Sequence, residues 1–423
     1  MRPPHPTLRE ALAWWWKLGW ISFGGPAGQI AVMHRELVER RRWIGEHRFL
    51  HALNYCMVLP GPEAQQLATY IGWLLHGTVG GVVAGALFVA PSLLVLCALS
   101  YVYVTWGDLP AVAGALDGVR PAVTALVAHA AWRIGKRALR TAPMIAVATA
   151  SLVARVAFDV PFPWIVGVAA LAGAIGGPTR FAAGGGHVAG KDYGPAVIDD
   201  DTPLAGRAIN PLLVLAIGAA LAATGLAMLD GTLRDMGGFF TTAALLTFGG
   251  AYAVLPYVYE GAVERFGWLT GPQMIDGLAL GETTPGPLIM VVAFVGYVGA
   301  VRQAVAGDPL LAGVLGASVA TFFTVLPSFV FILAGAPAVE ATRRMPRLTA
   351  PLAAVTAAVV GVIVDLGRFF AWHTLWPEGW DGGIDWIALG VGAAAAWALF
   401  ARDVGVVRLV LACAIVGLLT TIP

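Results

Sequence analysis

Ser22-Phe23-Gly24-Gly25 and Thr247-Phe248-Gly249-Gly250 are two copies of one short pattern, and they decide the fold. At the same offset along the chain, Pro60-Gly61-Pro62 aligns with Pro285-Gly286-Pro287. After a small insertion, Pro91-Ser92 aligns with Pro327-Ser328. A duplicated hydrophobic chain with glycine and proline breaks at matching positions is typical of membrane proteins built from two structural repeats.

The composition points to the membrane. The chain has 423 residues, of which 58% are apolar and 12% are charged, and its mean hydropathy is +0.77. Soluble domains carry about 25% charged residues. We therefore expect a multi-pass integral membrane protein that lies in the lipid bilayer. The net charge of +1 gives no reason to expect a nucleic-acid partner.

The polar, glycine-rich stretch around residues 177–208 divides the chain into parts. We predict an N-terminal repeat over residues 1–176 and a cytoplasmic linker over 177–208. A connecting transmembrane helix over 209–230 and a C-terminal repeat over 231–423 follow.

The distribution of basic residues indicates how the segments cross the membrane. Clusters of Lys and Arg at 35–48, 133–140 and 343–347 mark cytoplasmic loops by the positive-inside rule. If every apolar stretch crossed the membrane, the first two clusters would face opposite sides. The conflict disappears if the stretches that contain the four glycine/proline breaks are re-entrant hairpins, which enter and leave on the same side.

The same rule predicts that the two copies are inverted. The loop after the first break is rich in arginine, whereas its repeat partner carries only Arg265, so the copies face opposite sides. The predicted fold is therefore an all-α integral membrane protein with two inverted-topology repeats. Each repeat has two re-entrant, broken helical hairpins and additional membrane-spanning helices.

The breaks are the candidate binding site. After each break a new helix begins, and its first N–H groups lack helical partners and carry partial positive charge. Four such helix starts that meet near the midplane would bind an anion. Taken singly, each break is also explained by a kinked helix with a packing role, but duplication in register favours the functional interpretation. The predicted substrate-binding residues are Ser22, Gly24, Gly25, Pro60, Gly61, Pro62, Arg120, Thr247, Gly249, Gly250, Thr283, Thr284, Pro285 and Gly286.

Arg120 is included because a cation inside the membrane is a functional candidate by default. Its guanidinium group can donate two parallel hydrogen bonds to a tetrahedral oxyanion. Two other roles remain open, namely an ion pair with Asp117 nearby on the same helix and extension of the side chain to the membrane interface.

Two carboxylates flank the breaks. Glu63 follows Pro62, and Glu282 precedes the second Pro-Gly-Pro. Carboxylates at this depth are costly unless they are protonated or paired, so either residue is a candidate to carry a coupling proton. Glu63 has a second explanation, because an acidic residue in the first turn stabilises a helix.

The sequence lacks the motifs of nucleotide-driven or hydrolytic chemistry. It has no Walker motif, dinucleotide fingerprint, serine-nucleophile elbow or HExxH. The three cysteines show no metal or redox spacing. We therefore expect no enzyme activity, no cofactor and no metal site. The small residues Gly80-Gly81 and Gly85 permit close helix packing, which makes a homodimer plausible.

At these breaks the chain resembles the chromate ion transporter family in its long, two-domain form. The resemblance covers both halves, roughly 8–366, and it rests on the two Phe-Gly-Gly motifs, the Pro-Ser pairs and two longer runs. These runs are Leu59-Pro60-Gly61-Pro62-Glu63-Ala64-Gln65-Gln66-Leu67-Ala68 and Glu282-Thr283-Thr284-Pro285-Gly286-Pro287.

The resemblance implies a secondary transporter that exports chromate across the bacterial inner membrane and so confers chromate resistance. Sulfate has a similar charge and shape, so it is expected to compete. Importers or exchangers of sulfate or another oxyanion remain the alternative within transport. An intramembrane enzyme or a non-transporting membrane protein is the alternative from another class.

Overall fold

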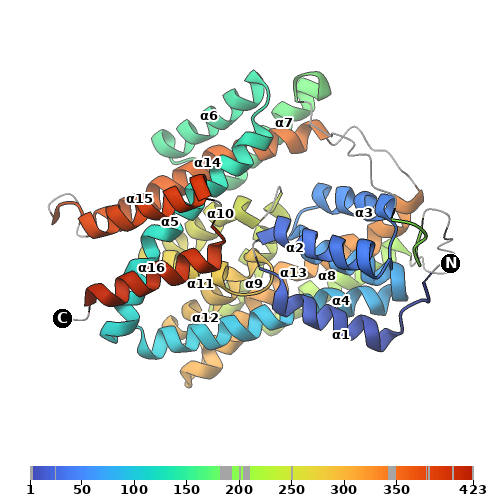
Figure 1. Cartoon of the computed structure of the whole chain (residues 1–423), viewed down its shortest axis with the longest axis horizontal. Helices are drawn as coiled ribbons and strands as arrows, with labels where there is room; N and C mark the ends of the chain where they lie inside the picture. The colour runs from blue at the N-terminus through green and yellow to red at the C-terminus, as the bar shows by residue number, and fades with distance from the viewer. Residues whose placement is uncertain are drawn as a thin grey trace.

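The computed structural model is helical throughout the parts of the chain that it describes (Figure 1). These are residues 3–23, 25–181, 193–199, 202, 210–248, 251–341, 349–377, 379, 382–402 and 404–421. The helices of the first half are α1 (Leu8–Ile21), α2 (Gly25–His34), α3 (Glu46–Val58), α4 (Glu63–Trp106), α5 (Pro110–Ala138), α6 (Ala142–Phe158) and α7 (Phe162–Arg180). Those that follow are α8 (Pro211–Met228), α9 (Gly231–Leu246), α10 (Leu255–Tyr259), α11 (Gly271–Thr283), α12 (Val291–Arg302), α13 (Pro309–Ala341), α14 (Thr349–Leu375), α15 (Trp386–Arg402) and α16 (Val406–Thr421). Short π segments, η1 (Arg35–Arg40) and η3 (Glu260–Arg265), extend α2 and α10, and two 3₁₀ turns are η2 (Ala251–Ala253) and η4 (Leu288–Met290).

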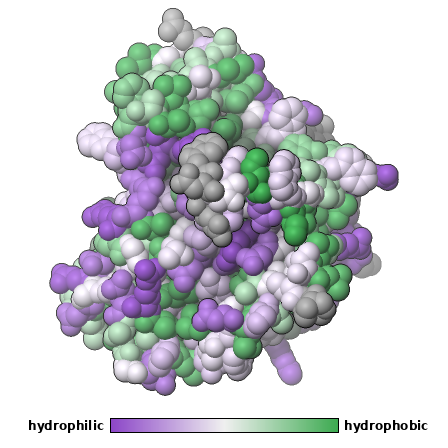
Figure 2. Space-filling model, turned by 90° about the vertical axis from the view of Figure 1, so that its left-hand side faces the viewer, coloured by the Kyte–Doolittle hydropathy of each residue, from purple (hydrophilic) through white to green (hydrophobic). Residues whose placement is uncertain are grey.

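The predicted all-α membrane class is confirmed. Five helices are long and apolar enough to cross a bilayer, within α4, α5, α8, α13 and α14. Large apolar side chains such as Ile175, Leu212 and Met228 are exposed on α7 and α8, where lipid would cover them. Figure 2 looks onto the end of the molecule at the left of Figure 1, where hydrophilic residues gather across the middle and apolar residues above them.

Helices end at the predicted breaks. α1 ends at Ile21 and α2 begins at Gly25, while α3 ends at Val58 and α4 begins at Glu63. In the second half, α9 ends at Leu246 and α11 ends at Thr283. Gly24, Gly249 and Gly250 lie outside the described residues.

α4 contains one further break, and the re-entrant course of the hairpin at Pro60-Gly61-Pro62 stays a prediction. His76 and Gly77 leave helical geometry, and Gly77 has a φ of +67°. The chain then turns back on itself, so that Gly72 lies against Gly80 and Ala84. The segment from Glu63 to this turn therefore returns alongside the rest of α4.

The small residues of α4 are occupied within the chain. Gly80 packs against Gly72, and Gly85 packs against Thr69 and Phe329. A homodimer through this face would need these contacts to separate. The small residues of α4 are therefore no longer a reason to expect a homodimer, which stays a prediction.

The helices pack in two groups, and each half of the chain contributes to both. The first group contains the broken helices and the long helices α4 and α13, with α1 against α4, α9 against α13 and α12 against α13. The second group is built from α5–α7 and α14–α16, with α14 against α5, α6 and α7, and α5 against α15 and α16. The division follows the duplication, because α5–α7 and α14–α16 are the last three helices of each half.

The predicted domain boundaries coincide with local features but stay predictions. α7 breaks its helical geometry at Gly177, where the predicted linker begins. Most of the linker lies outside the described residues, and α8 covers the predicted connecting helix.

Candidate functional site

The tips of the broken helices from the two halves cross and hold each other. The amide N–H of Gly61 donates to the carbonyl oxygen of Thr247 over 2.8 Å. The amide N–H of Gly286 donates to the carbonyl oxygen of Ser22, also over 2.8 Å. Each Pro-Gly-Pro tip thus binds the Phe-Gly-Gly break of the other half, and the contact occurs twice with the halves exchanged. Reciprocal contacts of this kind are what a pseudo-two-fold relation produces.

A second reciprocal contact fixes the two glycines. Gly61 and Gly286 have φ values of +124° and +106°, a region that favours glycine. A Cβ atom on Gly61 would collide with the hydroxyl of Ser328, and one on Gly286 would lie 2.6 Å from the Cβ of Ser92. The duplicated Pro-Ser pairs of α4 and α13 therefore press against the tips of the opposite half.

These contacts change one expectation about the site. We expected the amides of Gly61 and Gly286 to face a ligand, but they hold the two halves together. The free helical donors are instead the amides that follow in the first turn of α4, because its first intrahelical bond is made by the amide of Gln66 to the carbonyl of Pro62.

Several predicted hydroxyl groups are also used locally. The hydroxyl of Thr247 donates to the carbonyl of Ala243. The hydroxyls of Thr283 and Thr284 donate to carbonyls within α11, including those of Ala279 and Gly281. Ser22 differs, because its fully buried hydroxyl has no partner among the described residues.

Unpartnered polar atoms gather near the crossing. The buried side-chain oxygens of Ser22, Gln29, Gln65, Gln66 and Ser92 lack partners within the described part of the chain. Buried polar atoms are normally hydrogen-bonded, so these unsatisfied oxygens are available to a polar ligand. The amide groups of two glutamines brace the tips, because the Nε2 atom of Gln66 donates to the carbonyl of Pro60 and that of Gln29 to the carbonyl of Gly286.

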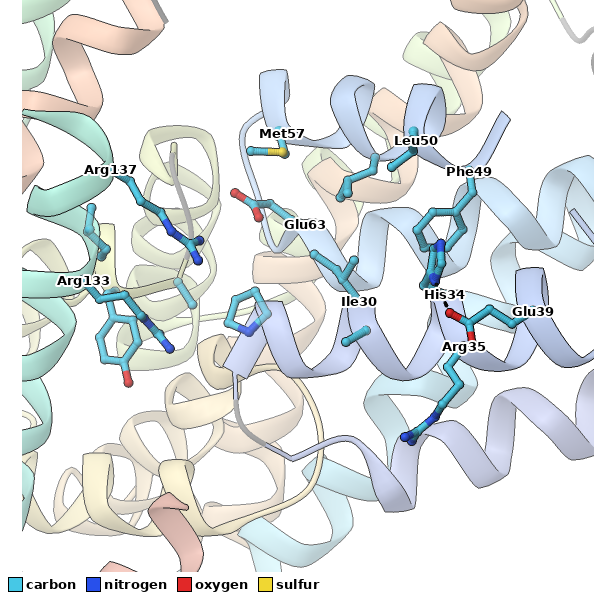
Figure 3. Close-up of a pocket in the computed structure, with 16 residues that line it drawn as sticks. Ile30, His34, Arg35, Glu39, Phe49, Leu50, Met57, Glu63, Arg133 and Arg137 are labelled. Atoms are coloured by element: carbon cyan, nitrogen blue, oxygen red, sulfur yellow. Dashed lines mark ion pairs between the residues drawn. The ribbon is translucent and has the colours of Figure 1, made fainter. Parts of the chain in front are cut away.

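A cavity of about 680 Å³ opens beside three of the four breaks. Pro26 follows the first break, Glu63 the second, and Ala251 and Tyr252 the third, and all of them line it. Arg133, Ile134 and Arg137 of α5 form the opposite wall (Figure 3). Residues from the basic clusters 35–48 and 133–140 thus line one cavity, which agrees with their predicted placement on one side of the membrane.

The two candidate coupling carboxylates lie at different depths. Glu63 is half-buried at the cavity wall and is the first residue of α4. Glu282 is buried behind the wall and accepts a short hydrogen bond from the hydroxyl of Tyr252. Tyr252 lines the cavity, so it connects Glu282 to that space.

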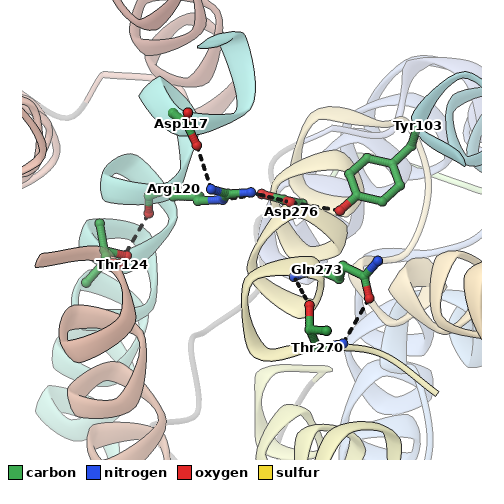
Figure 4. A network of polar contacts seen from close by, with 8 residues as sticks. Tyr103, Asp117, Arg120, Thr124, Thr270, Gln273 and Asp276 are labelled. Atoms are coloured by element: carbon green, nitrogen blue, oxygen red, sulfur yellow. Dashed lines mark hydrogen bonds and ion pairs between the residues drawn. The ribbon is translucent and has the colours of Figure 1, made fainter. Parts of the chain in front are cut away.

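Arg120 lies elsewhere, in a polar network between the two helix groups (Figure 4). Its Nε and Nη2 atoms donate to the two oxygens of Asp276 over 2.8 and 3.0 Å, and its Nη1 donates to Asp117 over 2.5 Å. The hydroxyl of Tyr103 donates to Asp276 over 2.9 Å. The Asp276 carboxylate is fully buried, and the guanidinium group of Arg120 pairs with both of its oxygens, which offsets the cost of removing the charge from water.

The structure therefore separates Arg120 from the other predicted site residues. It lines a second cavity of about 590 Å³ with Tyr103, Asp117 and Asp276. Thirteen residues of helix at 1.5 Å each place it roughly 20 Å along α5 from Arg133. The alternative role of Arg120 as a partner of Asp117 is present in the structure, with Asp276 as an additional partner.

Sequence reasoning missed four contributors to these two regions. Arg133 and Arg137 attracted attention only as part of a basic cluster, although their spacing of four residues places them on one face of a helix. Asp276 and Tyr252 carry no motif. An acidic residue in the middle of a short apolar helix was the available signal for Asp276.

Crossed, broken helices beside a cavity at the boundary of two helix groups define a multi-pass membrane protein of the transporter class. The chain belongs to the chromate transporter family, whose model matches residues 9–174 and 234–418. The two matched segments correspond to the two halves of the chain.

Curated relatives cover most of the chain. A chromate transport protein of Pseudomonas aeruginosa is 35% identical over 389 residues, which is 87% of this chain and 83% of the relative. A chromate transport protein of Cupriavidus metallidurans is 31% identical, with 85% and 82% covered. A probable chromate transport protein of Synechococcus elongatus is 29% identical, with 86% of each covered. No solved structure gives a significant match.

Proposed function

We propose that this protein is a secondary transporter that exports chromate across the bacterial inner membrane and so confers chromate resistance. The names of the relatives support chromate as the substrate. The observation that carries the mechanism is the crossing of Gly61 with Thr247 and of Gly286 with Ser22 beside a cavity. Sulfate, a tetrahedral dianion like chromate, is expected to compete.

The anion would be held where the breaks meet. Among the described residues, nothing accepts from the first-turn amides of α4 or from the hydroxyls of Ser22 and Ser92, so these groups can donate to the anion. Gly25 and the residues outside the described ranges, Gly24, Gly249 and Gly250, would allow the anion to approach the backbone. Pro60, Pro62, Pro285, Thr247, Thr283 and Thr284 would shape this region rather than donate to the anion, since the prolines lack an N–H and the threonines donate locally.

Transport requires access from each side in turn. The cavity between α5 and the broken helices would face the cytoplasm, because two basic clusters line it. The two helix groups would then tilt against each other around the crossed tips, as expected for inverted repeats. Glu63 at the wall and Glu282 behind Tyr252 are the proposed carriers of a coupling proton.

Energised inside-out vesicles test this proposal. Vesicles that contain the protein should accumulate radioactive chromate, and an excess of sulfate should reduce that accumulation. Accumulation only in right-side-out vesicles would favour an importer. No chromate movement in either orientation, with the protein shown to be inserted, would contradict chromate transport.

Glycine variants test the crossed tips in the same assay. Gly61→Ala should abolish most transport, because the methyl group would collide with Ser328 at a positive φ. Gly77→Ala is the matched control, since its φ is also positive but no atom lies within 4 Å of the added Cβ. Backbone strain alone costs about 1–2 kcal/mol, so equal losses in the two variants would argue against a role for the crossing.

A further inference from the structure

Arg133 and Arg137 form a pair of guanidinium groups on one wall of the large cavity. They lie one helical turn apart on α5, and both line the cavity with Ile134 between them. Figure 3 shows both side chains extending from α5 toward the broken helices. Arg133 is half-buried and Arg137 is exposed.

Within the described part of the chain neither guanidinium group forms an ion pair, although the buried Glu282 carboxylate lies within electrostatic reach of Arg133. Among the residues that the structure describes, no ion pair joins Arg133 or Arg137 to an acidic side chain. Arg120 lies on the same helix but differs from them, because it donates hydrogen bonds to two aspartates. Cations that face a cavity without an ion-pair partner can donate to an anionic ligand.

Glu63 is the carboxylate that faces this pair. Its side chain projects into the cavity toward Arg137 in Figure 3, and no described residue donates a hydrogen bond to it. Glu63 also begins α4, so it occupies the end of the helix whose first amides would bind an anion. An anion that enters between α5 and α4 would therefore meet two guanidinium groups and one carboxylate.

We propose that Arg133 and Arg137 form a binding site for a divalent tetrahedral oxyanion, and that the Glu63 carboxylate competes with the anion for them. The inference rests on the proposed function for the identity of the anion. Two guanidinium groups one turn apart can donate to separate oxygens of one dianion. When the anion leaves, the Glu63 side chain would move from its present position to the guanidinium groups, so that they gain a counter-charge. Release of the substrate and rearrangement of Glu63 would thereby be linked.

The test measures binding of chromate and of sulfate to the purified full-length protein at fixed salt concentration. Arg133→Gln should weaken chromate binding about tenfold or more, the effect of one lost charge-assisted hydrogen bond. Arg137→Gln should weaken it less, because this side chain is exposed to solvent. Glu63→Gln should strengthen binding, since it removes the competing charge.

Lys136→Gln is the matched control. It removes the same charge from the same helix, but Lys136 is exposed and does not line the cavity. Its affinity should stay near that of the unaltered protein. Arg133→Lys keeps the charge and loses the planar fork, so it should give an intermediate affinity even if Arg133→Gln folds poorly.

Each outcome bears on the proposal. Arg133 variants that bind chromate as tightly as the unaltered protein overturn the site, and weaker binding by Glu63→Gln overturns the competition. An unaltered protein that binds neither anion also overturns the site. If the binding results are as expected but vesicles move no chromate, the site stands and the proposed transport function fails.

Discussion

The two ends of α5, taken as residues 110–120 and 133–138, carry arginines in opposite situations. At one end, Arg120 spans the boundary between the helix groups and is satisfied by Asp276 and Asp117. At the other end, Arg133 and Arg137 face a cavity of about 680 Å³ across the same boundary. The first end is fastened, because carboxylates hold Arg120, and the second is open, because Arg133 and Arg137 have no ion pair among the described residues. A cavity lies beside each end.

Comparison of Arg120 with Arg133 and Arg137 indicates which guanidinium groups are available to a ligand. An arginine inside a membrane protein is a candidate for function, but partners decide its role. For Arg120 to bind an anion, it would have to leave a fully buried aspartate. Arg133 and Arg137 need no such rearrangement. Both positions line a cavity, and they differ because carboxylates already occupy the guanidinium group of Arg120.

The largest expected effect is on stability, at the fastened end. Asp276→Ala should lower the free energy of unfolding by about 3 kcal/mol, because it leaves the Arg120 charge without its main partner. Glu63→Ala at the open end should change it by less than about 1 kcal/mol, since Glu63 has no ion pair to lose. Thermal unfolding in detergent measures both. Equal losses would remove the distinction between the two ends.

The two ends of α5 should be accessible to a water-soluble reagent from opposite sides of the membrane, and the rate of cysteine labelling measures this. In a variant with Cys56, Cys97 and Cys413 replaced, Ile134→Cys should react with an impermeant maleimide from the cytoplasmic side, and chromate should slow the reaction. Leu116→Cys, which lines the cavity beside Arg120, should react from the opposite side. Labelling of both positions from one side would contradict the proposed orientation.

The smallest effects concern two tyrosines that each donate to a buried carboxylate. Tyr103→Phe removes one hydrogen bond to Asp276, while Arg120 remains bonded to that carboxylate. The free energy of unfolding should therefore fall by about 1 kcal/mol, and transport should persist. Tyr252→Phe removes the hydroxyl bonded to Glu282, so transport should fall more than stability does. Chromate flux and melting temperature, measured on both variants, check this. Indistinguishable flux would argue against a role for Glu282 in coupling.

Much of the fold follows from the sequence because the breaks are local. Clustered glycine and proline often interrupt a helix, so the ends of α1 and α3 were predictable from Gly25 and Pro60, although Pro91 and Pro121 lie inside α4 and α5. The charge pattern predicted hairpins that enter and leave the membrane on one side, and this topology stays a prediction. The crossing partner of each tip was not predictable, because hydrogen bonds such as Gly61 to Thr247 join residues far apart in sequence.

Of the residues named from the sequence, Glu63 lines the large cavity, and the assignment of the others to substrate binding stays a prediction. Duplication identified the residues around the breaks, including Glu63, which line or adjoin the cavity. It could not show that Arg120 has Asp276 as a partner, because that pair depends on the packing of α5 against α11. The duplication also did not single out Arg133. A basic cluster in a sequence does not indicate which of its side chains faces a cavity.

The most direct test of the account is the position of bound chromate in a structure of the full-length protein. Chromium can be located by its anomalous scattering in a crystal grown or soaked with chromate. The account predicts a peak in the cavity between Glu63 and the guanidinium groups of Arg133 and Arg137. A peak beside Arg120 and Asp276, with none in that cavity, would contradict it.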